Sequence, residues 1–195
     1  MLFAKRAFTT VASSFSAPRL LLVYHSRTGF ASSMADALEL GAREAAEAME
    51  CSLFVDRVAA SNATSKDVLG ADGYLFCAPE NLATVSGEMK EFFDRCYYDC
   101  FEWEKGKGDA DETSALLGRP YGLAIAGGSD GEGARRQVER ICTGWRLRNV
   151  SDSIVERNGL AQTAENILAH GKRCSPEAAE RCKQLGGLVA ATMLL

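Results

Sequence analysis

The stretch LLLVYHSRTGFASSM, residues 20–34, carries the strongest structural signal in this chain of 195 residues. Its first five residues form an apolar run that predicts a buried strand, and apolar residues at helical spacing from Met34 predict a helix. The turn between them contains Ser26, Thr28 and Gly29. We therefore predict a strand, a turn rich in hydroxyls and a helix start in direct succession.

This turn has the chemistry of an anion-binding site. Its hydroxyls and backbone N–H groups point to one spot, where the helix N-terminus adds about half a positive charge. Gly29 allows a close backbone approach and unusual dihedral angles. Arg27 either adds charge or is solvated. The sequence fits a phosphate monoester, and it fits equally an ordinary β–α turn in which Ser32 caps the helix.

Composition indicates one folded α/β domain over residues 20–195. A hydrophobic fraction of 47% argues against a disordered chain, and the length is sufficient for a single core. The net charge is −4. Because Lys5, Arg6 and Arg19 are the charged residues of the first 19, residues 20–195 carry a net charge of −7. This acidic balance argues against general nucleic-acid binding, which needs a basic face.

Residues 1–19 contain cations, serines and threonines but no acidic residue, a composition typical of organelle transit peptides. A plain disordered tail is the alternative. We predict a mitochondrial location, with cytoplasm and plastid as alternatives. No stretch of the sequence is apolar enough for a secretory signal or a membrane span.

The seven cysteines are odd in number and include no C-x-x-C pair, so they do not indicate a disulfide framework. Buried or surface thiols in a reducing compartment are the simpler interpretation, also for Cys96 and Cys100, whose spacing could place them on one helix face. Since His25 and His170 are the only histidines, we predict no metal site.

Beyond the opening stretch, short apolar runs alternate with segments of helical period. This alternation predicts a parallel sheet covered by helices on both faces, which is an α/β sandwich of three layers. Pro79 is expected to end the third strand, and Ser65 to cap a short helix. The expected strands are 20–24, 52–55, 73–78, 121–126 and 150–155, and the expected helices are 31–49, one within 61–69, 89–96, 134–144, 161–168 (alternatively a loop) and 176 onward.

Three loops leave the carboxyl ends of these strands, at residues 25–32, 79–87 and 127–133. All three are rich in Gly, Ser, Thr or Asn. Ligands of parallel sheets bind beyond this edge, where the strand order reverses. We therefore expect the three loops to form one site.

Two of these loops resemble those of flavodoxin-like proteins. Ser26-x-Thr28-Gly29 after an apolar strand resembles the flavodoxin phosphate loop, Ser/Thr-x-Thr-Gly-x-Thr. The segment Ala78–Arg95 contains a Pro loop followed by Ser-Gly-Glu-Met-Lys-Glu-Phe-Phe-Asp-Arg. It is similar to the second loop and helix of the flavodoxin-like NAD(P)H:acceptor oxidoreductases. The resemblance covers roughly residues 20–190.

The resemblance implies a flavodoxin-like sandwich whose five-stranded parallel sheet has the order 2-1-3-4-5. It implies FMN as the cofactor, with the phosphate at residues 26–31 and the isoalloxazine ring between the other two loops. NAD(P)H is the implied electron donor. The implied cofactor-binding residues are Ser26, Arg27, Thr28, Gly29, Phe30, Ala31, Pro79, Glu80, Asn81, Leu82, Gly127, Gly128, Ser129 and Asp130.

Two departures from the family pattern bear on function. Ala31 replaces the last Thr of the phosphate loop, so one hydroxyl contact is missing unless Ser32 supplies it. Residues 79–87 contain no Trp or Tyr, so the aromatic ring cover of simple flavodoxins is not expected. An uncovered ring face leaves room for a second substrate, which favours an oxidoreductase over a pure electron carrier.

Some residues have two interpretations. The Glu80 carboxylate either lies near the flavin, where it lowers the reduction potential, or is a capping or solvated group. Arg135 and Arg136 either meet the phosphates of a nicotinamide cofactor or lie on a solvated helix face. The aromatic residues of 97–118 form either a lid or subunit contact, which we favour slightly, or part of the core.

Three functions compete at this point. The first is an FMN-dependent oxidoreductase that passes electrons from NAD(P)H to a quinone or another small-molecule acceptor. The second is a flavodoxin-type electron carrier for a protein partner. The third is a non-catalytic member of the fold, which the missing hydroxyl at Ala31 supports. Flavin chemistry needs no side-chain base, so no catalytic residue is named. A homodimer or homotetramer is expected because proteins of the flavodoxin-like fold often form dimers or tetramers.

Overall fold

The computed structural model describes residues 17–102, 113–161 and 163–195. Their centre is a parallel sheet in the order β2-β1-β3-β7-β8, and β9 also pairs with β7. The predicted order 2-1-3-4-5 is confirmed, although two short strands share the fifth position. The parallel strands are β1 (Arg19–Tyr24), β2 (Phe54–Ala59), β3 (Gly73–Asn81), β7 (Pro120–Gly127), β8 (Arg148–Asn149) and β9 (Ile154–Arg157).

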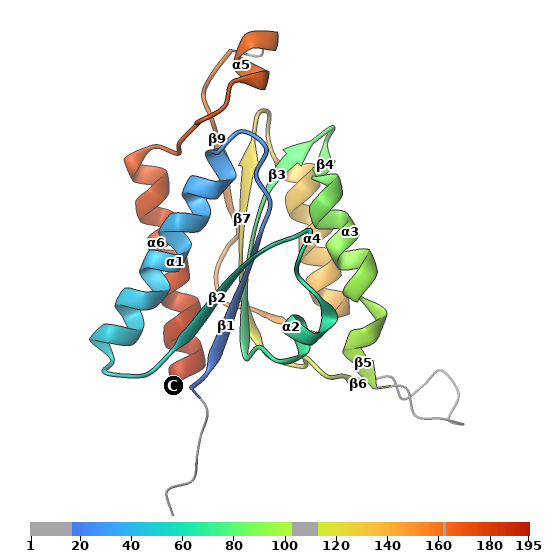
Figure 1. Ribbon diagram of the computed structural model, residues 1–195, viewed down its shortest axis with the longest axis vertical. Coiled ribbons are helices and arrows are strands. Elements are labelled where there is room, and N and C mark those ends of the chain that lie inside the picture. Colours follow the sequence, from blue (N-terminus) through green and yellow to red (C-terminus); the bar gives the residue numbers. More distant parts are fainter. Residues whose placement is uncertain (1–16, 103–112, 162) are drawn as a thin grey trace, which may run out of the picture.

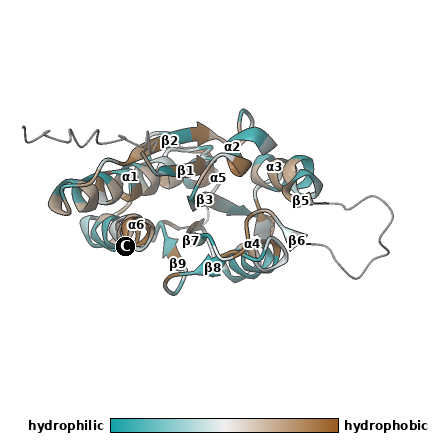
Figure 2. Ribbon diagram, turned by 90° about the horizontal axis from the view of Figure 1, so that it is seen from below, coloured by the Kyte–Doolittle hydropathy of each residue, from teal (hydrophilic) through white to brown (hydrophobic). Residues whose placement is uncertain are grey.

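Helices cover both faces of the sheet and give the predicted three layers (Figures 1 and 2). One face carries α1 (Phe30–Ala48) and α6 (Pro176–Leu194). The other carries α3 (Gly87–Cys96) and α4 (Glu132–Gly144). Each face therefore has its own hydrophobic cluster.

Strand β1 contributes to both clusters because its side chains alternate between the two faces. Leu20 and Leu22 pack against α1 and α6, whereas Leu21 and Val23 pack on the side of α3 and α4. All four side chains are fully buried. This explains why the strand reads as an uninterrupted apolar run.

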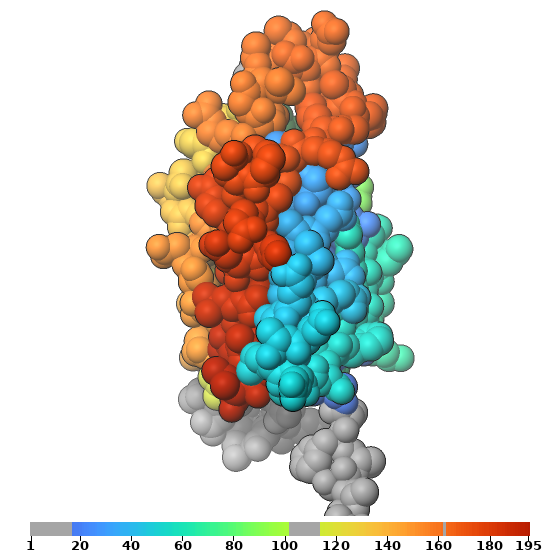
Figure 3. Space-filling view, turned by 90° about the vertical axis from the view of Figure 1, so that its left-hand side faces the viewer, coloured from blue at the N-terminus to red at the C-terminus, as the bar shows by residue number. Residues whose placement is uncertain are grey.

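Helices α1 and α6 lie side by side and in close contact (Figure 3). Two glycines make this approach possible. A Cβ atom on Gly41 would overlap the carbonyl oxygen of Lys183, and one on Gly186 would overlap that of Leu38. The segment that leads into α6 is thereby held at a fixed position beside the N-terminus of α1.

The cluster beneath α3 and α4 is largely aromatic. Phe76 packs against Phe93 and Trp145 with ring centroids 5.3 and 6.4 Å apart. Tyr97 stacks on Trp145 at 6.0 Å, and Phe101 packs against Tyr97 at 5.3 Å. The core interpretation therefore holds for Tyr97 and Phe101, while residues 103–112, including Trp103, lie outside the described residues.

Three predicted strands differ from the observed ones. β2 begins at Phe54, inside the expected 52–55 stretch, and runs beyond that stretch to Ala59. β3 does not stop at Pro79. Its partner β1 has already ended opposite Cys77, so the N–H that proline lacks costs no ladder hydrogen bond. The expected strand 150–155 is replaced by β8 and β9.

Short elements complete the chain. The N-cap of the helix α2 is Thr64 and not Ser65, because the Thr64 hydroxyl accepts the Asp67 N–H while Asp67 bonds back to the Thr64 N–H. Residues 161–168 contain a short helix, as predicted. The short elements are α2 (Ser65–Leu69), β4 (Thr84–Val85), η1 (Tyr98–Cys100), β5 (Phe101–Glu102), β6 (Thr113–Ser114) and α5 (Ala164–Leu168).

Cys96 and Cys100 are buried free thiols, and burial raises the pKa of Cys96 to about 11. Burial likewise raises the pKa of Cys100 to about 12. Within the described ranges, no helix has the length and hydropathy that crossing a membrane requires.

Candidate functional site

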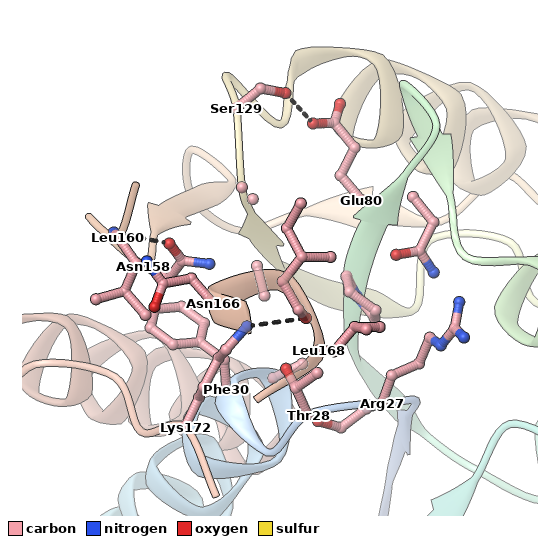
Figure 4. Close-up of a pocket in the computed structure, with 18 of the residues that line it drawn as sticks. Arg27, Thr28, Phe30, Glu80, Ser129, Asn158, Leu160, Asn166, Leu168 and Lys172 are labelled. Carbon is pink, nitrogen blue, oxygen red and sulfur yellow. Dashed lines mark hydrogen bonds between the residues drawn. The ribbon is translucent and has the colours of Figure 1, made fainter. Parts of the chain in front are cut away.

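The three predicted loops meet at the carboxyl edge of the sheet and line one cavity of about 620 Å³ (Figure 4). This volume is typical of small-molecule sites. Gly29 and Asp130 do not line the cavity, since Gly29 lies at the start of α1 and Asp130 accepts the N–H of Glu132. The predicted residues that line it are Ser26, Arg27, Thr28, Phe30, Ala31, Pro79, Glu80, Asn81, Leu82, Gly127, Gly128 and Ser129.

The first wall is the turn between β1 and α1. Gly29 has φ +102°, so it takes the left-handed conformation that favours glycine. It is the N-cap of α1 and supplies no side-chain cap, and the first turn contains no acidic residue. The first N–H groups of an α-helix lack intrahelical partners, so this 19-residue helix presents free donors and its positive dipole end to the cavity.

The missing threonine hydroxyl of this loop is not replaced by Ser32. Ser32 does not line the cavity, and its hydroxyl accepts a hydrogen bond from Arg57 Nη2 at 3.2 Å. The idea that Ser32 substitutes for the hydroxyl missing at Ala31 is therefore wrong. Ser26 remains in the cavity wall, where its Oγ accepts the Gly29 N–H at 3.1 Å.

The second wall is a hairpin formed by β3 and β4. Its two-residue turn consists of Leu82 with φ +53° and Ala83 with φ +61°. Positive φ at both positions is the pattern of a type I′ turn, which strongly prefers Asn and Gly. Leu82 and Ala83 hold this conformation without being glycine. Such local strain is often found at functional sites.

Glu80 joins the second wall to the third. Its Oε2 accepts a hydrogen bond from Ser129 Oγ at 2.8 Å (Figure 4). The same oxygen accepts another from the N–H of Gly131 at 3.1 Å. Gly131 is the N-cap of α4. Of the two interpretations of Glu80, the capping role thus has direct contacts, although the side chain also lines the cavity.

The third wall approaches the hairpin closely through glycine. A Cβ atom on Gly133 would overlap the carbonyl oxygen of Ala83. Val85 strengthens this junction, because its N–H donates to Gln137 Oε1 at 3.0 Å. The hairpin and the first turns of α4 therefore form one rigid wall of the cavity.

A fourth wall, which the sequence did not predict, comes from the segment between β9 and α6. It lies above the sheet at the carboxyl ends of the strands (Figure 1). Its backbone is tied to the first wall, since the N–H of Lys172 donates to the carbonyl of Thr28 at 2.9 Å. The lining residues of this segment are Asn158, Leu160, Ala161, Asn166, Ile167, Leu168, His170 and Lys172.

His25 directly follows β1 in the turn of the first wall and does not line the cavity. Its Nδ1 is 2.8 Å from Ser86 Oγ, and its Nε2 is 3.3 Å from Glu88 Oε1. Burial lowers the pKa of His25, and the Arg27 charge lowers it further, while Glu88 acts in the opposite direction. His25 therefore connects the turn after β1 to the start of α3.

Arg135 and Arg136 do not take part in the site. Neither lines the cavity. Arg135 forms ion pairs with Glu132 and Glu139, and Arg136 with Glu132. The solvated helix face is thus the correct interpretation of this pair.

The fold and the cavity together define a flavodoxin-like α/β protein with a nucleotide-sized site at the switch point of its sheet. A family model described as NADPH-dependent FMN reductase matches residues 28–157. The chain belongs to this family. It is an FMN-dependent oxidoreductase, with NAD(P)H as the electron donor.

Two relatives agree with this family. A flavodoxin of Aquifex aeolicus (strain VF5) is 30% identical over 173 residues, which are 88% of this chain and 85% of that protein. A protein of Arabidopsis thaliana named "Probable NAD(P)H dehydrogenase (quinone) FQR1-like 2" is 26% identical over 145 residues. The match covers 65% of this chain and about half of that relative, 49% of its length.

Solved structures show the same fold. An archaeal flavodoxin superposes with a TM-score of 0.65 at 13% identity, covering 91% of this chain and 99% of its own. An oxidoreductase of Corynebacterium diphtheriae gives a TM-score of 0.63 at 17% identity, covering 92% of this chain and 98% of its own. At these identities the likeness concerns the fold alone.

The residues present fit FMN. The uncapped N-terminus of α1 supplies donors for a phosphate, and the hairpin wall and the glycines at 127 and 128 line the same cavity of about 620 Å³. The charged residues that line the cavity are Arg27, Lys172 and Glu80, so its formal charge is positive if His170 is neutral, although the chain is acidic. A positive cavity favours an anionic ligand.

Proposed function

We propose that this oxidoreductase passes electrons from NAD(P)H to a small apolar acceptor of the quinone class. The observation that supports this proposal is the composition of the cavity mouth. Four large aliphatic side chains line the cavity and remain exposed: Leu82 (99%), Leu168 (67%), Ile167 (51%) and Leu160 (45%). Exposed apolar side chains that gather at a cavity mark an interaction site for an apolar partner.

Of the fourteen residues inferred from the sequence, the twelve that line the cavity are proposed to hold the cofactor. The N–H groups at the start of α1, together with Ser26 and Thr28, would bind the phosphate. Asn81 and the backbone of 127–129 would face the edge of the ring. Bound FMN supplies the hydride chemistry, because it can exchange two electrons with NAD(P)H and with an acceptor.

The acceptor reaction balances without a further reagent. NAD(P)H is oxidised to NAD(P)⁺, and the quinone takes up two electrons and two protons, one of them from solvent, to become a hydroquinone. The protein has to hold each reactant close to the ring and exclude water. No tyrosine or tryptophan of the described ranges lines the cavity, whose aromatic lining residues are Phe30 and His170.

The test compares two acceptors in steady-state NAD(P)H oxidation: an apolar naphthoquinone and the hydrophilic ion ferricyanide. We expect Leu168→Ser to raise the KM for the naphthoquinone several-fold and to leave turnover with ferricyanide unchanged. Leu188→Ser is the matched control, because Leu188 is a similarly exposed leucine on α6 that does not line the cavity. Equal effects of the two variants on the KM for the naphthoquinone, or no effect of Leu168→Ser on it, would contradict the proposed acceptor class.

A flavodoxin-type electron carrier is the second candidate. The 30% identity to a protein named flavodoxin over most of both chains favours it. A carrier would retain FMN and cycle with a protein partner, but it would show no turnover with free NAD(P)H and a quinone. A colourless protein that does not bind added FMN would instead indicate a non-catalytic member of the fold.

Location and assembly are proposed on the sequence alone. We propose that residues 1–19 direct the chain to the mitochondrion and that residues 20–195 form the FMN domain. Residues 1–16 lie outside the described residues. A fusion of residues 1–19 to a fluorescent protein tests the targeting, and light scattering of the purified protein tests the proposed homodimer or homotetramer.

A further inference from the structure

We propose that the ammonium group of Lys172 binds the phosphate of FMN, in place of the hydroxyl that the phosphate loop lacks at Ala31. This inference rests on FMN occupying the cavity. Lys172 lies 141 residues beyond Ala31 in the sequence, outside all three loops that the fold predicts as the site. It would give this chain a cationic phosphate ligand from the segment that precedes α6.

The backbone of Lys172 is fixed against the phosphate loop. Its N–H donates to the carbonyl of Thr28 at 2.9 Å. Its own carbonyl oxygen would lie 2.8 Å from a Cβ atom on Gly29, so the two backbones touch at that point. Two residues further on, the N–H of Cys174 donates to Ser33 Oγ in the first turn of α1 at 2.8 Å. The loop and the segment therefore form one unit.

The side chain of Lys172 extends into the cavity. It lines the cavity together with Thr28 and Ala31, and Figure 4 shows it between Phe30 and Thr28. Nζ donates to the carbonyl oxygen of Ile167 at 3.2 Å, which holds the amine over the cavity (Figure 4). An ammonium group has three donors, so two remain for a ligand.

The charge of Lys172 has no counter-ion in the site. Among residues 17–102, 113–161 and 163–195, no carboxylate forms an ion pair with it. Glu80 is the acidic residue of the lining, and its Oε2 bonds to Ser129 and Gly131 at the far wall. Arg27 points away from Lys172 (Figure 4). A cation without an ion-pair partner, in the cavity that the N-terminus of α1 also faces, is complementary to a phosphate monoester, which carries nearly two negative charges.

The phosphate loop lacks one hydrogen-bond donor of the family pattern. Position 31 has a methyl group where the family pattern has a hydroxyl, and the hydroxyl of Ser32 is bonded to Arg57 outside the cavity. Lys172 can supply the missing contact and adds a full positive charge. The fourth wall thus takes part in holding the cofactor as well as the acceptor.

The experiment measures dissociation constants for FMN and for riboflavin, which lacks the phosphate. Full-length protein freed of its flavin is titrated by quenching of flavin fluorescence. We expect Lys172→Gln to weaken FMN binding at least tenfold and to leave riboflavin binding unchanged, while Lys172→Arg retains most of the preference for FMN. Lys66→Gln is the matched control, since it removes an equal charge from an exposed lysine on α2 that does not line the cavity.

The possible outcomes separate this inference from the assignment of the cavity. A wild-type protein that prefers FMN, with a Lys172→Gln variant that keeps the same preference, would overturn the role of Lys172 alone. Equal weakening of FMN and riboflavin binding would also overturn it, because Lys172 would then affect flavin binding only by supporting the cavity wall. If the wild type binds neither flavin, the cofactor site itself is wrong and this inference fails with it.

Discussion

The N–H of Gly131 donates a 3.1 Å hydrogen bond to Glu80 Oε2, and this contact joins the second strand-end loop to the N-terminus of α4. Ser129 Oγ donates to the same oxygen at 2.8 Å. A negative charge at a helix N-terminus is favourable. The carboxylate therefore fixes the relative position of two of the walls that would hold the flavin ring.

This contact leads to a prediction for Glu80→Gln. The amide keeps the shape but removes the charge and weakens the two hydrogen bonds, so we expect the free energy of unfolding to fall by about 1 kcal/mol. We expect the midpoint potential of bound FMN to stay unchanged, because the carboxylate is engaged with α4. Urea unfolding and potentiometry on the same variant check both points. A raised midpoint with unaltered stability would show that Glu80 acts on the flavin instead.

The turn at the hairpin tip predicts a stabilising substitution. Ala83 has φ +61°, a conformation that costs a non-glycine residue about 1 kcal/mol. We expect Ala83→Gly to raise the free energy of unfolding by about 0.5 kcal/mol, since part of the relief is lost to the greater entropy of the unfolded chain. Ala48→Gly, at an exposed helical position, should destabilise instead. If Ala83→Gly is as destabilising as Ala48→Gly, the turn is not strained.

The close contact between α1 and α6 predicts a large loss of stability when Gly186 is replaced. A Cβ atom there would overlap the carbonyl of Leu38 in a packed helix pair, so we expect Gly186→Ala to lower the free energy of unfolding by about 3 kcal/mol. Gly87→Ala is the control. Nothing lies within 4 Å of a Cβ atom at Gly87, which is in the first turn of α3, so that variant should gain about 0.5 kcal/mol. Similar stabilities of the two variants in urea unfolding would show that α1 and α6 are further apart.

The lowered pKa of His25 predicts that the stability of the fold depends on pH. Its pKa in the folded protein lies below the ordinary 6.5, because burial and Arg27 outweigh Glu88. As the pH falls below 6.5, the unfolded chain therefore binds the proton more readily, and stability decreases with a slope of at most about 1.4 kcal/mol per pH unit. Unfolding curves between pH 7.5 and 5.5 measure it. His25→Gln should flatten this slope, and an equal slope in the variant would assign the effect to other groups.

Much of the fold and of the site could be predicted from local patterns. The apolar run at 20–24 and the glycine-containing turn after it led to a strand, a turn and a helix start that the structure shows. The carboxyl ends of parallel strands share one edge, so the three loops had to meet. Twelve of the fourteen residues named on this basis line the cavity.

The remainder depended on contacts between distant parts of the chain. The hairpin of β3 and β4 was missed because its turn, Leu82-Ala83, lacks the Asn-Gly signal of a type I′ turn. The fourth wall contains no strand-end motif, and Leu160 and Leu168 look like ordinary apolar residues of a short helix or loop. The proposed role of Lys172 depends on its backbone bond to Thr28, 144 residues earlier. The hydrogen bond from Arg57 to the Ser32 hydroxyl could not be predicted from the sequence either.

The central claim is that FMN lies at the carboxyl edge of the sheet, with its phosphate at the turn after β1. A crystal structure of the protein with FMN bound tests it most directly. We predict density for the phosphate at the N–H groups that begin α1, and the ring between the hairpin of Leu82 and the glycines at 127 and 128. Density for FMN at any other place on the protein, or the ring and phosphate in exchanged positions, would contradict the account.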